Sequence, residues 1–119
     1  MSLPVGAWRI DANGFSGQLN IAGVSAQGDV TGTLHMNSEP VNNLNGVAFW
    51  DDTAKKITFM RVINPAQPGT FQIYTGYFFP TDHTKPNGQR QLAGSFEAFS
   101  GTGAVASRVL YGWFASFGG

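Results

Sequence analysis

The chain has 119 residues, of which 42% are hydrophobic, 13% are aromatic and only 12% are charged. Seven Lys and Arg residues balance seven Asp and Glu residues, which argues against nucleic-acid-binding and polybasic membrane-surface proteins, because both need excess positive charge. The absence of Cys excludes a disulfide framework, a thiolate zinc site and a thiol nucleophile.

Short segments of β-type composition follow one another along the whole chain. Gly, Asn, Asp and Pro recur at short intervals, and the segments between them favour Phe, Ile, Val, Thr, Tyr and Trp. We predict eight strands, over residues 6–10, 15–21, 29–36, 46–51, 56–63, 70–79, 90–99 and 107–116. Strands joined by hairpins imply a meander, and closure removes its exposed edges. The sequence therefore predicts an all-β protein whose single domain, residues 1–119, is an eight-stranded antiparallel up-and-down meander barrel.

The N-terminal residues carry neither a basic region nor a long apolar segment, so no signal peptide is recognisable. Nor does any window approach the ~20 apolar residues of a membrane-spanning helix. We expect a soluble chain without membrane or nucleic-acid partners. It would be either cytoplasmic or secreted with its signal removed.

The predicted strands differ in how apolar and polar residues alternate. Segments 15–21 and 29–36 alternate regularly, which is typical of a strand with one face in water. Segment 56–63 instead places Ile57 and Phe59 on one face and Met60 and Val62 on the other. Such two-sided strands would leave a large apolar patch outside a small barrel, and these patches usually mark interfaces. We expect a homo-oligomer, a dimer or tetramer, joined through the outer faces of the strands from 46–51 to 107–116. The alternative is a flattened barrel, or a sandwich in which a loop covers that face.

The first third of the chain resembles the avidin and streptavidin family. Residues 6–8 (GAW) provide the G-x-W opening that other calycin barrels share, and residues 28–33 (GDVTGT) provide a G-x-x-T-G-T third strand. Residues 74–77 (YTGY) are similar to the family's sixth strand. The resemblance implies an eight-stranded barrel that holds biotin at one end and assembles through its later strands.

The family's biotin-binding residues are largely replaced in this sequence. The Tyr that follows T-G-T corresponds to Leu34, the strand-five Trp is nearest Met60, and the Trp residues of strands six and seven become Tyr74 and Phe96. A site built to hydrogen-bond a buried polar group loses affinity when those partners are lost. The resemblance thus implies the barrel without tight biotin binding.

Polar residues at strand ends point to one rim of the predicted barrel. The family's first-hairpin Asn and Ser correspond to Asp11 or Asn13 and to Ser16. In a meander, the ends of odd strands and the starts of even strands share a rim, which also gathers Arg61 and Arg108. A polar rim with aromatic walls is a plausible ligand site. Our predicted ligand-binding residues are Asp11, Asn13, Ser16, Leu34, Arg61, Tyr74, Phe96 and Arg108. A solvated rim or a structural ion pair is the alternative for the charged members.

These features favour a non-catalytic protein that binds a small organic molecule in one end of the barrel. A carbohydrate-binding, lectin-type oligomer is the first alternative, and exposure of Trp50 would favour it. A barrel-cyclase enzyme is the second, favoured by a closed cavity with Arg61 or Glu97 pointing inward. With two His residues and no βαβ unit, we expect neither a metal nor another cofactor.

Overall fold

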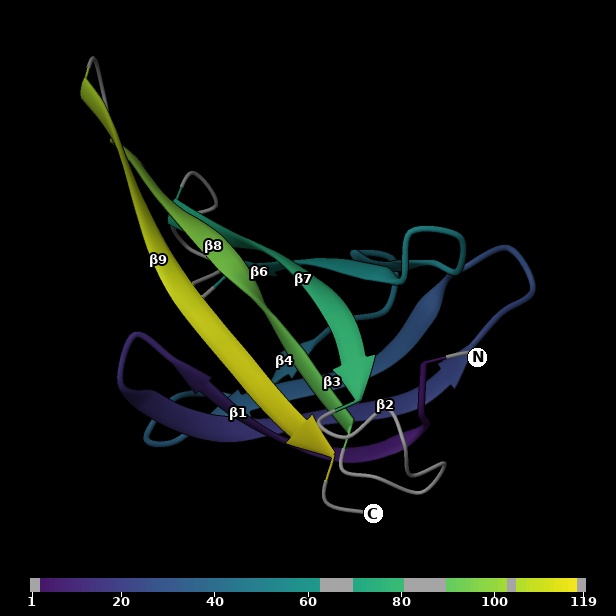
Figure 1. The fold of residues 1–119 in the computed structure, drawn as a ribbon. Coiled ribbons are helices and arrows are strands. Elements are labelled where there is room, and N and C mark those ends of the chain that lie inside the picture. Colours follow the sequence, from purple (N-terminus) through teal and green to yellow (C-terminus); the bar gives the residue numbers. More distant parts are fainter. Residues whose placement is uncertain (1–2, 63–69, 81–89, 103–104, 118–119) are drawn as a thin grey trace.

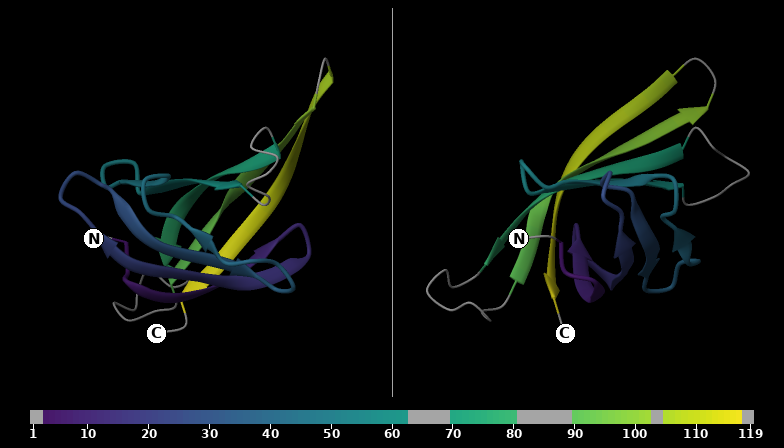
Figure 2. Two further views of the ribbon diagram at one scale, coloured as in Figure 1. Left: turned by 180° about the vertical axis from the view of Figure 1, so that it is seen from behind. Right: turned by 90° about the vertical axis from the view of Figure 1, so that its right-hand side faces the viewer.

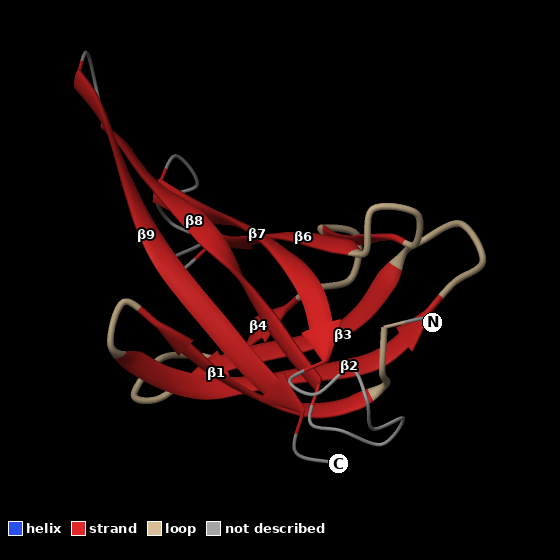
Figure 3. Ribbon diagram, viewed as in Figure 1, coloured by secondary structure: helices blue, strands red, loops and turns tan. Residues whose placement is uncertain are grey.

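The computed structural model describes residues 3–62, 70–80, 90–102 and 105–117, with the backbone alone for Pro80 and for residues 100–102 and 105–109. Strands are the regular elements throughout this part of the chain (Figure 3). They are β1 (Gly6–Ala12), β2 (Phe15–Val24), β3 (Val30–Met36), β4 (Asn42–Asn43), β5 (Ala48–Asp51), β6 (Lys56–Val62), β7 (Thr70–Pro80), β8 (Arg90–Thr102) and β9 (Val105–Phe117). None of the described residues belongs to a helix long and apolar enough to cross a membrane.

All nine strands form one antiparallel sheet in the order β4-β3-β2-β1-β9-β8-β7-β6-β5. The last strand pairs with the first, so the sheet curls round and encloses the core (Figure 1). The hairpin of β8 and β9 projects beyond the other strands, as two further views show (Figure 2). The predicted all-β meander barrel is thereby confirmed.

Each of the eight predicted segments contains a strand, but two details differ. The structure adds β4, a pair of Asn residues that the sequence gives no strand character. It also extends β8 to Thr102 and begins β9 at Val105, where the prediction placed a longer loop. The ladder there continues through Gly101 and Ala106, because backbone hydrogen bonding does not require an alternating side-chain pattern.

The two edges of the curled sheet meet along a seam between β3–β4 and β5–β6. Asp29 and Phe49 form an isolated antiparallel bridge there, and the Trp50 N–H donates to the Gly28 carbonyl at 2.7 Å. Further along, the Asn42 side-chain amide donates to the Val62 carbonyl at 2.8 Å. The seam therefore depends on a few backbone and side-chain bonds instead of a continuous ladder.

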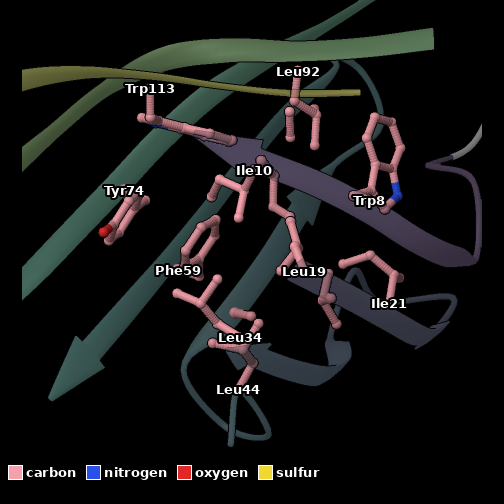
Figure 4. Close-up of a cluster of buried hydrophobic side chains, with 14 of the residues drawn as sticks. Trp8, Ile10, Leu19, Ile21, Leu34, Leu44, Phe59, Tyr74, Leu92 and Trp113 are labelled. Carbon is pink, nitrogen blue, oxygen red and sulfur yellow. The ribbon is translucent and has the colours of Figure 1, made fainter. Parts of the chain in front are cut away.

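The core fills the barrel between its two ends. Inward-pointing residues of β1, β2 and β3 are fully buried, and they meet rings from β6, β7 and β9 (Figure 4). Trp8 closes this core towards the start of β1, where its ring packs against Phe117 at 5.2 Å and its Nε1 donates to the Pro4 carbonyl. Burial of these large apolar side chains provides the main driving force for folding.

Candidate functional site

A cavity of about 590 Å³ opens at one end of the barrel. It lies where β1 turns into β2, where β3 and β6 end and β7 begins, and beside the middle of β8 and β9. Its walls combine aromatic, small and polar side chains. The lining residues are Ala12, Asn13, Phe15, Met36, Asn37, Ser38, Glu39, Arg61, Gln72, Tyr74, Phe96, Ala98 and Tyr111.

One wall of the cavity is part of a ladder of four aromatic rings. Phe59, Tyr74, Phe96 and Tyr111 lie directly opposite one another on the adjacent strands β6, β7, β8 and β9. The ring centroids of successive neighbours are 4.6, 4.6 and 5.2 Å apart. Because the rings stack face to face, their electropositive edges remain free to contact a ligand. Such edges pack favourably against the electronegative face of an aromatic ring.

Trp113 lies below this ladder and supports it. Its indole meets the rings of Phe59 and Tyr74 edge to face, at 5.7 and 5.8 Å. Its Nε1 donates to the carbonyls of Thr75 on β7 and Ser95 on β8. The indole can lie so close to β7 because the inward position beneath it is Gly76. The ladder is thus held from below by a fixed indole.

A chain of polar groups runs along the other side of the cavity. The Arg61 Nε donates to Asn42 Oδ1 at 2.8 Å, and its Nη1 lies 3.4 Å from Gln72 Oε1. The Tyr74 hydroxyl donates to the same Gln72 oxygen at 2.7 Å. Arg61 is 5% exposed, and its Nη2 is buried with no hydrogen-bond partner among the described residues.

Burial raises the pKa of the Tyr74 hydroxyl, although the nearby Arg61 guanidinium acts in the opposite direction. Desolvation disfavours the charged phenolate, and this effect dominates. Tyr74 is therefore neutral at physiological pH and acts as a hydrogen-bond donor, so it supplies no negative charge to Arg61.

The structure brings four of the predicted ligand-binding residues to the cavity: Asn13, Arg61, Tyr74 and Phe96. Leu34 is fully buried within the core instead (Figure 4). Asp11 and Ser16 pair with each other on the outer side of β1 and β2, since the inward positions there are Ala12 and Gly17.

Arg108 belongs to β9, but its side chain lies outside the described residues. Glu97 alternates with the inward Phe96, so it belongs to the outer face of β8. The same alternation places Arg61, and not Met60, on the inner face of β6. The inward residue that follows Phe59 is therefore a cation.

Tyr111 and the turn after β3 are among the parts of the lining that the predicted ligand-binding residues did not include. Tyr111 is the last ring of the aromatic ladder. It lies two residues before Trp113, so the sequence could predict that both face the same side of β9. It could not predict which residue of β8 lies opposite Tyr111. Asn37, Ser38 and Glu39 follow β3 in a turn, and Ser38 has a positive φ of 67°. No pattern in the sequence predicted that this turn would lie at the mouth of the cavity.

A second cavity, of about 640 Å³, lies at the opposite end of the barrel, beside the turns that follow β2 and β5. Trp50 borders it but is only 6% exposed, with its Nε1 donating to Asp52 at 3.1 Å. Asp52 also accepts from Lys55 at 3.0 Å, and this bond, with that from Trp50, lowers the pKa of Asp52. Asp51 caps its own turn through the N–H groups of Thr53 and Ala54. These polar groups thus have partners within the turn.

The described residues contain no group of three or more His, Asp or Glu side chains placed to hold a metal ion. The candidate site is consequently the cavity bordered by Arg61 and the aromatic ladder, which we call the ladder cavity.

Comparison with known proteins gives structural neighbours but no sequence relatives. No protein-family model matches the chain, and no curated protein matches it. Among solved structures, the P21 form of apo shwanavidin is similar over 100% of both chains, with a TM-score of 0.65 and 14% identity. A low-affinity mutant of shwanavidin is similar over 98% of both chains, with a TM-score of 0.64 and 16% identity. Together with the curled antiparallel sheet, these neighbours show that the chain has an avidin-like fold.

Proposed function

We propose that the protein binds a small organic molecule, without catalysis, in the ladder cavity. The observation that carries this proposal is a cavity of about 590 Å³ against the ring ladder, in the size range of small-molecule sites. Edge contacts from Tyr74, Phe96 and Tyr111 supply apolar surface, while Asn13 and Gln72 supply polar groups. An avidin-like fold supports a binding role by analogy.

The proposed ligand-binding residues are those that border the ladder cavity: Asn13, Arg61, Tyr74 and Phe96 from the sequence, joined by Gln72 and Tyr111. Leu34 supports the pocket only through the core, because it is fully buried. Tight biotin binding is not expected, since Leu34, Tyr74 and Phe96 offer one hydroxyl between them. Excess biotin should therefore leave the melting temperature almost unchanged.

The lectin-type alternative needs an exposed aromatic platform, and Trp50 does not provide one. Its ring is almost fully buried and packs edge to face against Phe78 at 6.4 Å. The cyclase alternative requires Arg61 to point into a closed cavity. Arg61 does point inward, but the cavity is open. The ladder cavity is instead bordered by the exposed Asn13, Phe15 and Glu39. This geometry favours reversible ligand entry.

Calorimetry with 2-naphthamide, a neutral bicyclic aromatic, tests this proposal. We expect saturable binding at one site per chain, with a sub-millimolar Kd. Ala98→Trp fills the cavity from β8 and should weaken binding at least about tenfold, whereas Ala22→Trp, at an exposed position of β2 away from the cavity, should not. The proposal is wrong if no saturable binding occurs, or if Ala98→Trp leaves the affinity unchanged.

We further propose that the protein assembles with copies of itself through the outer face of β6 to β9. Tyr77, Phe79, Leu110 and Phe114 are 54%, 40%, 63% and 52% exposed there. Phe71 and Phe99 stack at 4.9 Å on the same face. A second copy is the proposed occupant, because this face carries large apolar side chains on adjacent strands and little charge.

A further inference from the structure

Arg61 is an unusual residue for the position that it occupies. It follows Ile57 and Phe59 on the inner face of β6, where it is 5% exposed. Removing a guanidinium from water costs free energy unless a charged partner and hydrogen bonds compensate. An inward Arg without such compensation therefore calls for an explanation.

The described neighbours of Arg61 do not neutralise its charge. Its two hydrogen-bond acceptors, Asn42 and Gln72, are neutral amides, and the nearby Tyr74 is a protonated phenol. Lys55 and Asp52 form an ion pair, but it lies at the opposite end of the barrel.

The acidic side chains near this end of the barrel lie elsewhere. Asp11 and Glu97 are on the outer face, and Glu39 is an exposed residue at the mouth. None of the three lies within 4.0 Å of the guanidinium in the described part of the chain. The described side chains thus leave the charge of Arg61 uncompensated, and among them Nη2 finds no acceptor for its two donors.

We infer that the ligand of the ladder cavity is an apolar or aromatic carboxylate, and that the Arg61 guanidinium binds its carboxylate group. This inference rests on the proposed function and adds the chemical class of the ligand. Arg61 borders the cavity, so the ring system can lie against the ladder edges while the carboxylate meets the cation. The weak 3.4 Å contact of Nη1 with Gln72 allows the guanidinium to turn Nη2 towards the ligand.

A carboxylate suits this site better than a phosphate does. A guanidinium and a carboxylate match in a planar, two-bond geometry, and one cation balances one negative charge. A dianion would need a second cation. Glu39, at the mouth of the same cavity, would also repel a dianion more strongly than a monoanion.

A purely structural role for Arg61 is the competing explanation. Its Nε–Asn42 bond joins β6 to β4 across the seam, next to the bond between Asn42 and Val62. That role uses Nε alone, and leaves the unpartnered Nη2 and the missing counter-charge unexplained. The two explanations predict different effects of ligand charge on affinity. If Arg61 only stabilises the seam, the affinity should not depend on whether the ligand carries a carboxylate.

The test compares 2-naphthoate with 2-naphthamide, which share a ring system and differ in charge. By calorimetry at pH 7 and low salt, we expect the wild-type protein to bind the carboxylate about tenfold more tightly or better. In Arg61→Met this preference should fall to about one, whereas Arg61→Lys should retain part of it. Arg9→Met, which removes an exposed cation of β1, should keep the full preference.

Two further measurements separate ligand binding from stability. Asn42→Ala breaks the seam contact but keeps the charge, so it should lower the melting temperature yet still favour 2-naphthoate. In the wild-type protein, the Arg61 side-chain ¹⁵N resonances should shift clearly more with 2-naphthoate than with 2-naphthamide. These measurements decide the matter even if Arg61→Met does not fold.

The possible failures are distinguishable. Equal affinities for the two compounds, with both still sensitive to Ala98→Trp, would overturn the carboxylate inference and leave the binding function standing. A preference that survives Arg61→Met would place the anion elsewhere and also overturn it. Binding of neither compound would overturn the function and the inference together.

Discussion

Gly76 shows how a single missing side chain shapes the ladder cavity. It occupies an inward position of β7, and a Cβ there would overlap the six-membered ring of the Trp113 indole. A larger residue would push the indole away from Phe59 and Tyr74, which it supports. The requirement is for space alone, because this glycine has no positive φ.

We expect Gly76→Ala to reduce the free energy of unfolding by about 1–3 kcal/mol, the usual cost of overpacking a core. Gly112→Ala is the matched control, since its Cβ would meet nothing nearer than the Gly94 carbonyl oxygen at 3.9 Å. Urea denaturation of both variants measures the difference. Similar stability of the two variants would mean that the indole moves without cost.

Arg61 is the converse case. At Gly76 a side chain is absent because packing leaves no space, whereas at Arg61 a charged side chain is present where packing alone would favour an apolar one. The residues around it on the inner face of β6 are apolar, and its neutral partners only partly compensate its burial. Sites that bind a charged ligand commonly retain such a cost in the free protein. The preference for a carboxylate is the property that this residue is expected to confer.

At the scale of elements, the seam is where the barrel depends on the fewest bonds. The turn between β2 and β3 meets β5 through the hydrogen bond from Trp50 N–H to the Gly28 carbonyl. Gly28 has a φ of +95°, and a Cβ there would collide with the Trp50 carbonyl oxygen. Conformation and close approach thus both require glycine at this position.

Substitution of Gly28 should therefore open the seam. We expect Gly28→Ala to lower the free energy of unfolding by about 2–4 kcal/mol, the sum of the positive-φ cost and the steric cost. Gly46→Ala isolates the first cost, because Gly46 has a φ of +85° with no atom near its would-be Cβ, and should lose about 1 kcal/mol. Amide hydrogen exchange of the Trp50 N–H would show whether the opening is local. Equal losses in the two variants would contradict a steric role for the seam.

At the scale of the whole molecule, the outer surface of the curled sheet differs in polarity between its two halves. The outer side of β1 to β3 presents polar residues such as Arg9, Gln18 and His35. The outer side of β6 to β9 presents exposed apolar residues instead, Leu110 and Phe114 among them. This asymmetry is the basis for proposing self-assembly through one side of the barrel.

Sedimentation velocity at micromolar concentration checks the assembly. We expect the wild-type chain to sediment as a dimer or larger, and the double variant Leu110→Glu with Phe114→Glu to sediment as a monomer, because buried unpaired charge disfavours the interface. Gln18→Glu, which adds a charge to the polar half, should leave the assembly intact. A monomeric wild-type chain would contradict the proposal.

The sequence by itself determined the strands and, where alternation is regular, their faces. Alternation is a local property, so the eight segments and the inward faces of β2 and β3 could be read from neighbouring residues alone, whereas β6 is apolar on both faces and its inward side could not. Asp51 as the cap of its own turn was predictable for the same reason, since both partners lie within three residues of it.

Only the tertiary structure decided which inward residues meet. The rings of Phe59, Tyr74, Phe96 and Tyr111 form a ladder because the registers of three separate strand pairs place them at one level, and register between strands is not a local property. The burial of Trp50 and the contact of Arg61 with Asn42 arise likewise from closure of the seam. Closure joins segments far apart in the chain, and alternation along each strand specifies a face but neither a depth nor a partner.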